Sequence, residues 1–249
     1  MTALLAGKTA FVTGGSAGIG FAIIEAFAAA GAAGYAFDPA PPAEPLPKGW
    51  QHRAGDVRDE GSLAGALAAL KKERGRLDIL VANAGIVPPW RESEAIGLEE
   101  WDNVFAINVR GMVATIKQGI PLMKEAGGSI ITMASVNAFT GHGRQAAYVA
   151  SKHAVLGLMR ATAQDVGRYR IRVNAICPGP VPTAALMARL RERADKGGAT
   201  EKATMRRYSQ TALGRLASLS EVAGVAVFLA SGLSSGITGQ SIVVDAGAA

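Results

Sequence analysis

Thr9-Ala10-Phe11-Val12-Thr13-Gly14-Gly15-Ser16-Ala17-Gly18-Ile19-Gly20 is the stretch that decides the fold of this 249-residue chain. Its first five residues are apolar or β-branched, which predicts a short buried strand. The glycines that follow predict a tight turn. Apolar residues then recur in steps of three and four up to Ala30, which predicts a helix with one buried face that ends at Gly31.

The same alternation of strand and helix patterns continues along the chain. Further short apolar runs predict strands at 34–38, 77–82, 129–134, 171–176 and 241–245. Helical patterns lie at 62–72, 101–124, 147–169 and 220–231. Continuous apolar strands that alternate with helices are typical of a parallel sheet. We therefore predict an α/β fold, a single-domain doubly wound parallel sheet (Rossmann-type) over residues 1–249 with helices on both faces.

A proline-rich segment interrupts this alternation. Residues 39–47 contain five prolines, which remove backbone donors and clash inside helices. The connection after the second strand is therefore predicted to be an extended surface loop without a helix.

Composition indicates where the protein works. Hydrophobic residues make up 49% of the chain, and the single cysteine, Cys177, excludes an intrachain disulfide and argues against a cysteine-based metal site. No apolar run reaches the roughly 20 residues that span a bilayer, and the first eight residues lack the pattern of a signal peptide. We expect a soluble cytoplasmic protein with no metal and no membrane partner.

The glycine-rich turn is also a candidate phosphate-binding site. Glycines let the backbone approach a pyrophosphate, and a helix N-terminus supplies N–H groups and a favourable dipole. The spacing Gly14-(x)3-Gly18-x-Gly20 differs from the commoner G-x-G-x-x-G order, and such a turn can also serve only as a turn. Because it follows the opening strand, we predict dinucleotide binding by Gly14, Ser16, Ala17, Gly18, Ile19 and Gly20.

Asp38 ends the second predicted strand, 18 residues after Gly20. A carboxylate at this place accepts hydrogen bonds from the ribose hydroxyls of NAD and repels the 2′-phosphate of NADP. No Lys or Arg occupies positions 15–17 or directly follows Asp38. These features predict NAD as the cofactor, although an aspartate here can also simply open the proline-rich turn.

Tyr148 and Lys152 are four residues apart on a predicted helix, so their side chains lie on one face. A free phenol, with a pKa of ~10, is a poor base at neutral pH. A nearby ammonium favours the phenolate, which takes a proton from an alcohol or returns it in a reduction. The spacing is common on ordinary helices, so taken alone the pair indicates only a structural contact.

Several further motifs occur in a fixed order over nearly the full length of the chain. They are Thr13-Gly14-(x)3-Gly18-Ile19-Gly20, Asp56-Val57, Asn83-Ala84-Gly85, Asn108, Ser135, Tyr148-(x)3-Lys152 and Pro178-Gly179. With this set the chain resembles the short-chain dehydrogenase/reductase family. Two departures are Ala82, where the family usually has a second asparagine, and the short connection between Asp38 and Asp56, where relatives commonly place a helix.

The resemblance implies catalytic roles at four positions. Ser135 would orient the substrate oxygen, and Tyr148 would be the general acid/base. Lys152 would lower the pKa of Tyr148 and hold the nicotinamide ribose. Asn108 would kink its helix and bind a water that feeds a proton relay. Taken singly, Asn108 can also be an ordinary polar helix residue and Ser135 a cap at the end of a strand.

The resemblance also implies where the rest of the cofactor lies. Asp56 and Val57 would bracket the adenine. The segment Asn83, Ala84 and Gly85 would line the adenine-ribose side. Beside Tyr148 and Lys152, the nicotinamide would contact Pro178, Gly179, Val181 and Thr183.

The segment after Pro178-Gly179 usually forms a substrate lid in this family, and here we predict a lid over about 181–217. Residues 189–207 contain seven basic and three acidic side chains, a local charge of +4. A lid arginine can recognise an anionic substrate, although a solvated helix face with internal ion pairs explains the same pattern. Trp90 and Phe139 lie near these motifs and are further candidates to line the pocket, and the candidate substrate-binding residues are Asn137, His142, Gln145, Arg206 and Arg207. His142 lies between two glycines and can also be only a loop residue.

The predicted function is that of an NAD-dependent oxidoreductase. It would transfer a hydride between nicotinamide and a secondary alcohol or ketone, of which a diol, a polyol and a hydroxy acid are examples. The alternatives are an NADP-dependent 3-ketoacyl-type carbonyl reductase and a noncatalytic regulator that senses NAD. The net charge of +6 is scattered without interleaved aromatic residues, so no nucleic-acid partner is expected. The resemblance implies a homotetramer formed through the helices at 101–124 and 147–169.

Overall fold

A computed structural model describes residues 3–248, so residues 1, 2 and 249 of the predicted domain lie outside the described part. Within it, seven parallel strands form one sheet in the order β3-β2-β1-β4-β5-β6-β7. The strands are β1 (Thr9–Thr13), β2 (Ala33–Asp38), β3 (Trp50–Ala54), β4 (Ile79–Ala82), β5 (Gly128–Met133), β6 (Ile171–Pro178) and β7 (Ser241–Val244). The order reverses between β1 and β4, which confirms the predicted doubly wound sheet.

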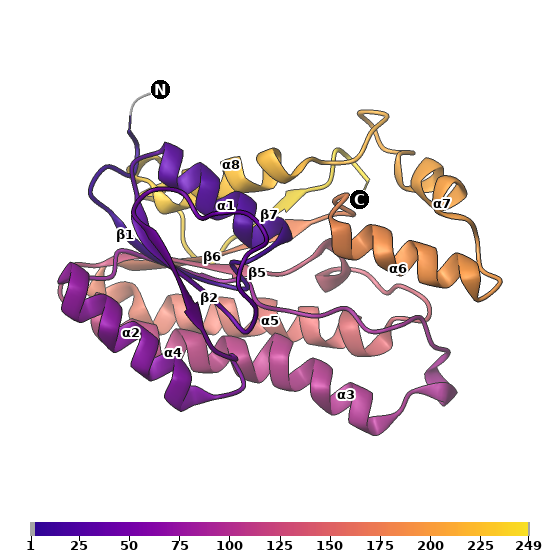
Figure 1. Ribbon diagram of the computed structural model, residues 1–249, viewed down its shortest axis with the longest axis horizontal. Coiled ribbons are helices and arrows are strands. Elements are labelled where there is room, and N and C mark those ends of the chain that lie inside the picture. Colours follow the sequence, from indigo (N-terminus) through magenta and orange to yellow (C-terminus); the bar gives the residue numbers. More distant parts are fainter. Residues whose placement is uncertain (1–2, 249) are drawn as a thin grey trace.

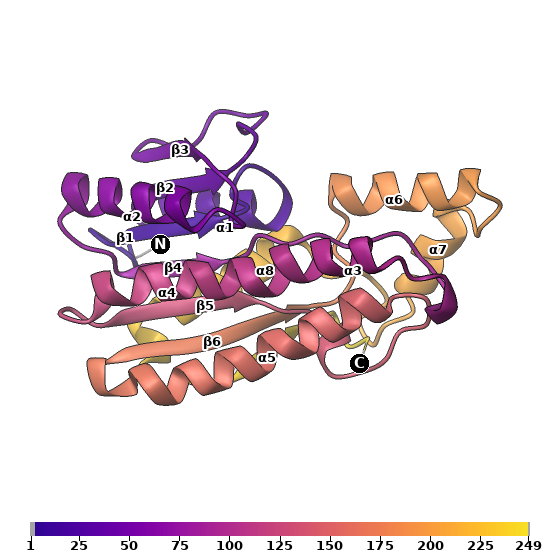
Figure 2. The ribbon, with the colours of Figure 1, turned by 90° about the horizontal axis from the view of Figure 1, so that it is seen from below.

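Helices cover both faces of this sheet (Figures 1 and 2). One face carries α1 (Gly18–Ala29) and α8 (Leu219–Ala230), which pack against each other. The other carries α2 (Glu60–Arg74), α4 (Gly111–Met123) and α5 (Ala146–Val166). The helix predicted at 101–124 consists of α3 (Leu98–Phe105), a π-helical turn (Ala106–Arg110) and α4.

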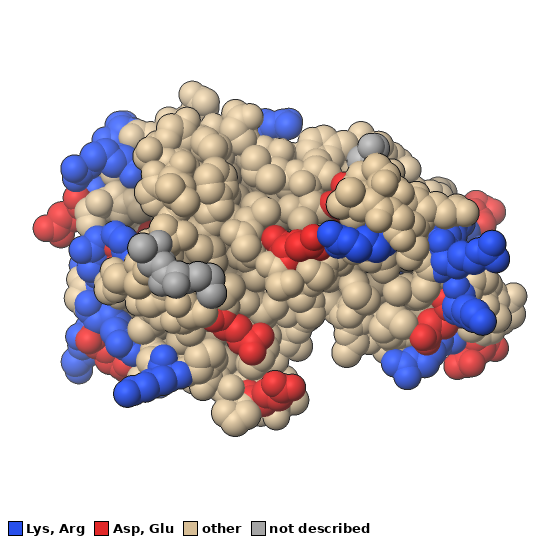
Figure 3. All heavy atoms as spheres, turned by 90° about the horizontal axis from the view of Figure 1, so that it is seen from above, with Lys and Arg blue, Asp and Glu red and all other residues tan. Residues whose placement is uncertain are grey.

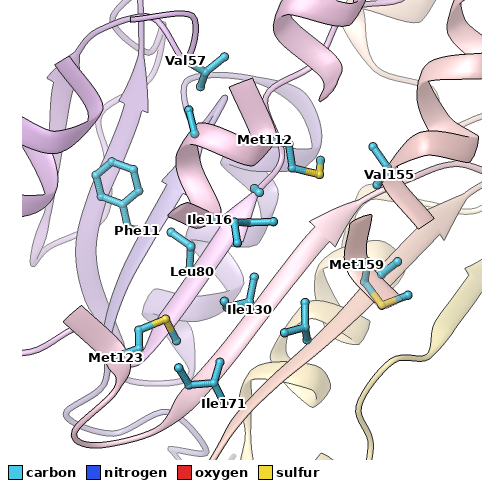
Figure 4. Close-up of a cluster of buried hydrophobic side chains, with 14 of the residues drawn as sticks. Phe11, Val57, Leu80, Met112, Ile116, Met123, Ile130, Val155, Met159 and Ile171 are labelled. Atoms are coloured by element: carbon cyan, nitrogen blue, oxygen red, sulfur yellow. The ribbon is translucent and has the colours of Figure 1, made fainter. Parts of the chain in front are cut away.

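Two apolar clusters hold these layers together. Figure 4 shows the cluster between the sheet and α4 and α5, where Leu80 and Ile130 of the strands face Ile116 of α4 and Val155 of α5. The opposite cluster includes Ile23 and Phe27 of α1. Both clusters consist of buried apolar side chains, and such close-packed cores hold the sheet as a rigid platform.

The connection from β2 to β3 contains no helix, as its prolines predict. β3 itself is not among the predicted strands. Its five residues, Trp50–Ala54, are mostly polar and only Trp50 is buried, because β3 pairs with β2 alone at the edge of the sheet.

The remaining helices stand beyond the carboxyl ends of the strands. They are α6 (Ala184–Asp195) and α7 (Glu201–Tyr208), both within the predicted lid at 181–217. Their position places them over the edge where ligands bind in doubly wound sheets. Within residues 3–248, every helix is too short or too polar to cross a lipid bilayer.

Candidate active site

A cavity of about 730 Å³ lies between the carboxyl ends of the strands and α6. Figure 3 shows the hollow that separates the sheet from the end of the molecule that carries the lid helices. Most of the predicted site residues line this cavity. They are Gly14, Ala17, Gly18, Ile19, Gly20, Asp38, Asn83, Ala84, Gly85, Ser135, Asn137, His142, Gln145, Tyr148, Lys152, Pro178, Gly179, Val181 and Thr183.

The glycine-rich turn forms a tight cradle between β1 and α1. Gly14 and Gly18 have positive φ angles of 64° and 55°, a conformation that side chains disfavour. A Cβ on Gly20 would lie 2.0 Å from the Gly14 carbonyl oxygen. At the start of α1, Ala17 provides no side-chain cap, so the first N–H groups of the helix stay available to a ligand. This backbone fits a pyrophosphate.

Asn83 fixes the cradle to the neighbouring strand. Its Nδ2 donates to the carbonyl oxygens of Thr13 and Gly14, each at 3.0 Å. In return, the Thr13 hydroxyl accepts from the backbone N–H groups of Asn83 and Ala84, at 3.0 and 3.1 Å. The side chain of Asn83 therefore holds the turn in shape, while Ala84 and Gly85 present backbone to the cavity.

Asp38 lies at the end of β2 and lines the cavity beside the glycine-rich turn. Its carboxylate accepts from the backbone N–H groups of Ser16 (3.3 Å) and Ala40 (3.2 Å). The Ser16 hydroxyl donates to the Ala40 carbonyl at 2.7 Å, so Ser16 supports the loop without lining the cavity. Among the described residues that line the cavity, Lys and Arg occur only as Lys152 and Arg189, which lie on α5 and α6 and not beside Asp38.

Asp56 and Val57 stand outside the cavity lining. The Asp56 carboxylate forms an ion pair with Arg58 at 2.6 Å, and this pairing lowers the pKa of Asp56. Val57 is buried where α4 approaches, and a Cβ on Gly111 would lie 2.6 Å from Val57 Cγ2. Contact of these two residues with an adenine stays a prediction.

Ser135 and Tyr148 meet at the carboxyl edge of the sheet. Ser135 follows β5, and its hydroxyl accepts from the Asn137 N–H at 3.2 Å. Tyr148 lies in the first turn of α5 and lines the same cavity as Ser135. Burial raises the pKa of Tyr148, while the nearby Ser135 hydroxyl and the positive charge of Arg189 act to lower it.

Lys152 lies one helical turn beyond Tyr148, and its ammonium is 5.6 Å from the centre of the tyrosine ring. Its Nζ donates to the Met133 carbonyl at 2.8 Å. The side chain is only 4% exposed, and burial lowers the pKa of Lys152 to about 8. Lys152 thus lies beside the tyrosine ring, and the predicted lowering of the Tyr148 pKa by Lys152 stays a prediction.

Asn108 is fully buried in the π-helical turn behind the cavity wall. Its Oδ1 accepts from the Ile86 N–H at 2.8 Å. Its Nδ2 donates to the Ile86 carbonyl at 2.9 Å and to the Ser151 hydroxyl at 3.1 Å. Asn108 therefore joins the segment after β4 to the helix that carries Tyr148 and Lys152. Its part in a proton relay stays a prediction.

The lid contributes a different arginine from those predicted. Arg206 and Arg207 are exposed on α7 outside the cavity lining, as is Phe139 after β5. Arg189 of α6 lines the cavity instead. The lining residues that the sequence analysis does not name as site residues are Ile86, Val87, Met133, Ala134, Val136, Pro180, Ala184, Ala185, Leu186, Arg189 and Tyr208.

A sequence signal for Arg189 does exist. Thr183 caps α6 by accepting from the Leu186 N–H at 3.1 Å. Residues 185 and 186 precede Arg189 by one helical turn, so all three share a face with the cap. Once the sequence is taken to predict a helix capped by Thr183, the helical spacing places Arg189 on the same face as Leu186. In the structure this face lines the cavity.

Comparisons with known proteins agree with this geometry. The family described as Enoyl-(Acyl carrier protein) reductase, adh_short_C2, matches residues 14–249. The chain is a short-chain dehydrogenase/reductase. It is 37% identical to trans-4-hydroxycyclohexanecarboxylate dehydrogenase of Sinomonas cyclohexanicum over 192 residues, which covers 77% of this chain and 68% of that protein.

Two solved structures share the whole fold of this short-chain dehydrogenase/reductase. Aldohexose dehydrogenase of Thermoplasma acidophilum is 30% identical with a TM-score of 0.91, covering 99% of this chain and 96% of that one. Carveol dehydrogenase of Mycobacterium avium, in complex with NAD, is 32% identical with a TM-score of 0.87 and covers 98% of both chains. This chain is accordingly an oxidoreductase of the family that acts on alcohol or ketone substrates and binds a nicotinamide cofactor.

Proposed function

We propose that the cavity binds NAD and that the enzyme interconverts a secondary alcohol and its ketone with Tyr148 as the general acid/base. The observation that carries this proposal is the meeting of Ser135, Tyr148 and Lys152 at one edge of the sheet, beside the glycine cradle. The carveol dehydrogenase complex with NAD supports the choice of cofactor.

The preference for NAD over NADP rests on Asp38. Its carboxylate is fixed by two backbone N–H groups at the mouth of the cradle, where a ribose would arrive. A 2′-phosphate at this place would meet a negative charge with no arginine or lysine among the described lining residues beside it. The arrangement therefore favours a free ribose diol.

The protein's own groups handle the proton. When bound, NAD supplies the acceptor or donor of the hydride. In oxidation, Ser135 donates a hydrogen bond to the substrate oxygen, and the Tyr148 phenolate takes the hydroxyl proton as the carbon–oxygen double bond forms. The Lys152 ammonium stabilises that phenolate. In reduction, the same Tyr148 hydroxyl returns its proton to the new alkoxide.

A panel of secondary alcohols and ketones, assayed with both cofactors, tests the proposal. The absorbance of the reduced nicotinamide reports turnover. We expect NADH formation with at least one alcohol, and a higher kcat/KM for NAD than for NADP. Turnover with NADP alone would overturn the cofactor assignment, and no turnover across diols, polyols, ring alcohols and hydroxy acids would overturn the reaction.

A further inference from the structure

Arg189, Trp90 and Gln145 form a polar cluster in the cavity wall, at the side where α6 of the predicted lid lies. The Arg189 guanidinium lies 4.4 Å from the centre of the Trp90 ring, within the range of a cation–π contact. With its amide oxygen turned towards both donors, Gln145 accepts from the Trp90 indole N–H at 3.2 Å and from Arg189 at 3.1 Å. The cluster joins α6, the start of α5 and the loop after β4, and all three residues line the cavity.

The guanidinium of Arg189 has no carboxylate partner within residues 3–248. Its acidic neighbour Glu192 pairs with Lys196 at 2.6 Å, and Arg191 pairs with Glu201 at 3.7 Å. The Nη2 of Arg189 donates to the Pro88 carbonyl at 3.4 Å, whereas its Nε is buried without any hydrogen-bond partner. A buried donor left unpaired is costly, so the protein's own groups do not fully satisfy this guanidinium.

The surroundings suit an anion with an apolar body. Among the described lining residues the only acidic one is Asp38, which lies across the cavity at the end of β2. Apart from Gln145, the cavity lining near Arg189 includes the apolar Leu186, one turn before it on α6, and the aromatic Trp90. Burial lowers the pKa of the Arg189 guanidinium, yet an arginine stays charged at neutral pH.

The cluster is close enough to the reacting group to share a ligand with it. Gln145 precedes Tyr148 by three residues, at the N-cap of the same helix. The charge of Arg189 also acts on the Tyr148 hydroxyl, and the tyrosine on Arg189. A small molecule whose oxygen is at Tyr148 can therefore extend to Arg189.

We propose that Arg189, oriented by Trp90 and Gln145, binds the carboxylate of the substrate, so that the enzyme acts on apolar hydroxy acids or oxo acids. Nη1 of Arg189 has no hydrogen-bond partner among the described residues, so its N–H groups offer two donors to the carboxylate oxygens. That the enzyme oxidises or reduces such a molecule at Tyr148 rests on the proposed function, whereas the binding of its carboxylate by Arg189 does not. The exposed Arg206 and Arg207 have no part in this site.

Binding of a matched pair of probes tests the proposal without turnover. The probes are cyclohexanecarboxylate and cyclohexanecarboxamide, which have similar shape and differ in charge. Isothermal titration is run on the full-length protein with and without NAD, and quenching of indole fluorescence gives a second signal that Trp90→Phe should remove. The wild type should bind the carboxylate at least ~10-fold more tightly than the amide, the factor expected for a charge-assisted hydrogen bond.

Three variants locate the site. Arg189→Leu should abolish the preference for the carboxylate, and Arg189→Lys should keep a weaker one, because it retains the charge without the fork. Arg191→Leu is the matched control, since it makes the same change of charge on the same helix at an exposed side chain. Arg191→Leu should keep the wild-type preference.

The outcomes are separable. Equal binding of the two probes by the wild type, binding of neither, or a preference that survives in Arg189→Leu would overturn the proposal. A merely structural arginine would weaken both probes alike. If a thermal melt shows that Arg189→Leu is not folded, the carboxylate preference of the wild type and its weakening in Arg189→Lys still test the proposal. Carboxylate binding without any NADH formation would reject the proposed function and leave this site standing.

Discussion

The two ends of the cavity are built in different ways. At the cofactor end, shape comes from backbone, since Gly14, Gly18 and Gly20 leave room and the first turn of α1 presents its N–H groups. At the lid end, shape comes from long side chains, chiefly Arg189 and Trp90. The backbone end can serve any reaction of a nicotinamide, whereas the side-chain end can select one substrate class. Variants at and between the two ends test this division.

The largest effect is expected at Lys152, which lies between the ends. Its pKa is about 8 in the folded protein and about 10.4 when unfolded, so protonation opposes folding. Below pH 8 Lys152 is protonated in both the folded and the unfolded protein, so the full cost of burying its charge lowers the free energy of unfolding. Between about pH 8 and 10.4 only the unfolded state keeps the proton, so wild-type stability gains on the order of 3 kcal/mol as pH rises through this window.

Lys152→Met removes this dependence. Urea unfolding of both proteins from pH 7 to pH 10 should show the stability advantage of Lys152→Met shrinking as pH rises, while its activity is lost at every pH. An advantage that stays constant across the range would show that the ammonium is not desolvated in the native state.

The next effect is expected in the backbone cradle. Gly20→Ala places a Cβ 2.0 Å from the Gly14 carbonyl oxygen and 2.6 Å from Asn83 Nδ2, so the turn must move. NAD affinity should fall by about 100-fold, as expected for a few kcal/mol of overpacking in the binding loop. Fluorescence titration with NADH measures it.

Gly65→Ala is the control for that substitution. Gly65 is exposed in α2 with nothing near its added Cβ, so alanine should leave NADH binding unchanged and add roughly 0.5–1 kcal/mol of stability. Wild-type affinity in Gly20→Ala would show that the cradle does not hold the cofactor.

A smaller effect is expected at Asp38. Asp38→Asn removes the charge that opposes a 2′-phosphate, so the ratio of kcat/KM for NAD over NADP should fall by about 10-fold. Glu44→Gln, an exposed change of the same charge in the connection after β2, should leave the ratio as it is. An unchanged ratio in Asp38→Asn would remove the basis for the NAD preference.

The cofactor end could be predicted from sequence because its determinants are local. A strand, a glycine-rich turn and a helix follow one another within residues 9–30, and Asp38 follows at the end of the next strand. Strands buried on both faces are continuous apolar runs, so the interior of the sheet could be predicted as well. β3 could not, because an edge strand needs few apolar residues: Arg53 lies over the Tyr35 ring and bonds Glu73 at 2.6 Å.

The lid end could not be predicted in the same way. The charges in 189–207 predict a basic segment, and the Thr183 cap predicts which residues share a face of α6. Whether that face meets the cavity depends on how α6 docks. Arg189 meets Trp90 from a loop about 100 residues earlier in the chain, and only the tertiary fold brings them together. Arg206 and Arg207, equally basic in sequence, lie on a helix that leaves them in solvent.

The rate of hydride transfer in a single turnover tests most directly the claim that Tyr148 is the general acid/base. Excess enzyme and NAD are mixed with the best alcohol of the panel, and stopped-flow absorbance follows NADH formation by the wild type and by Tyr148→Phe. The Tyr148 hydroxyl is the proposed proton acceptor, so its removal should slow the step by about 10²- to 10⁴-fold while NADH affinity stays the same. Equal rates in the two proteins would contradict the assignment of Tyr148 as the acid/base.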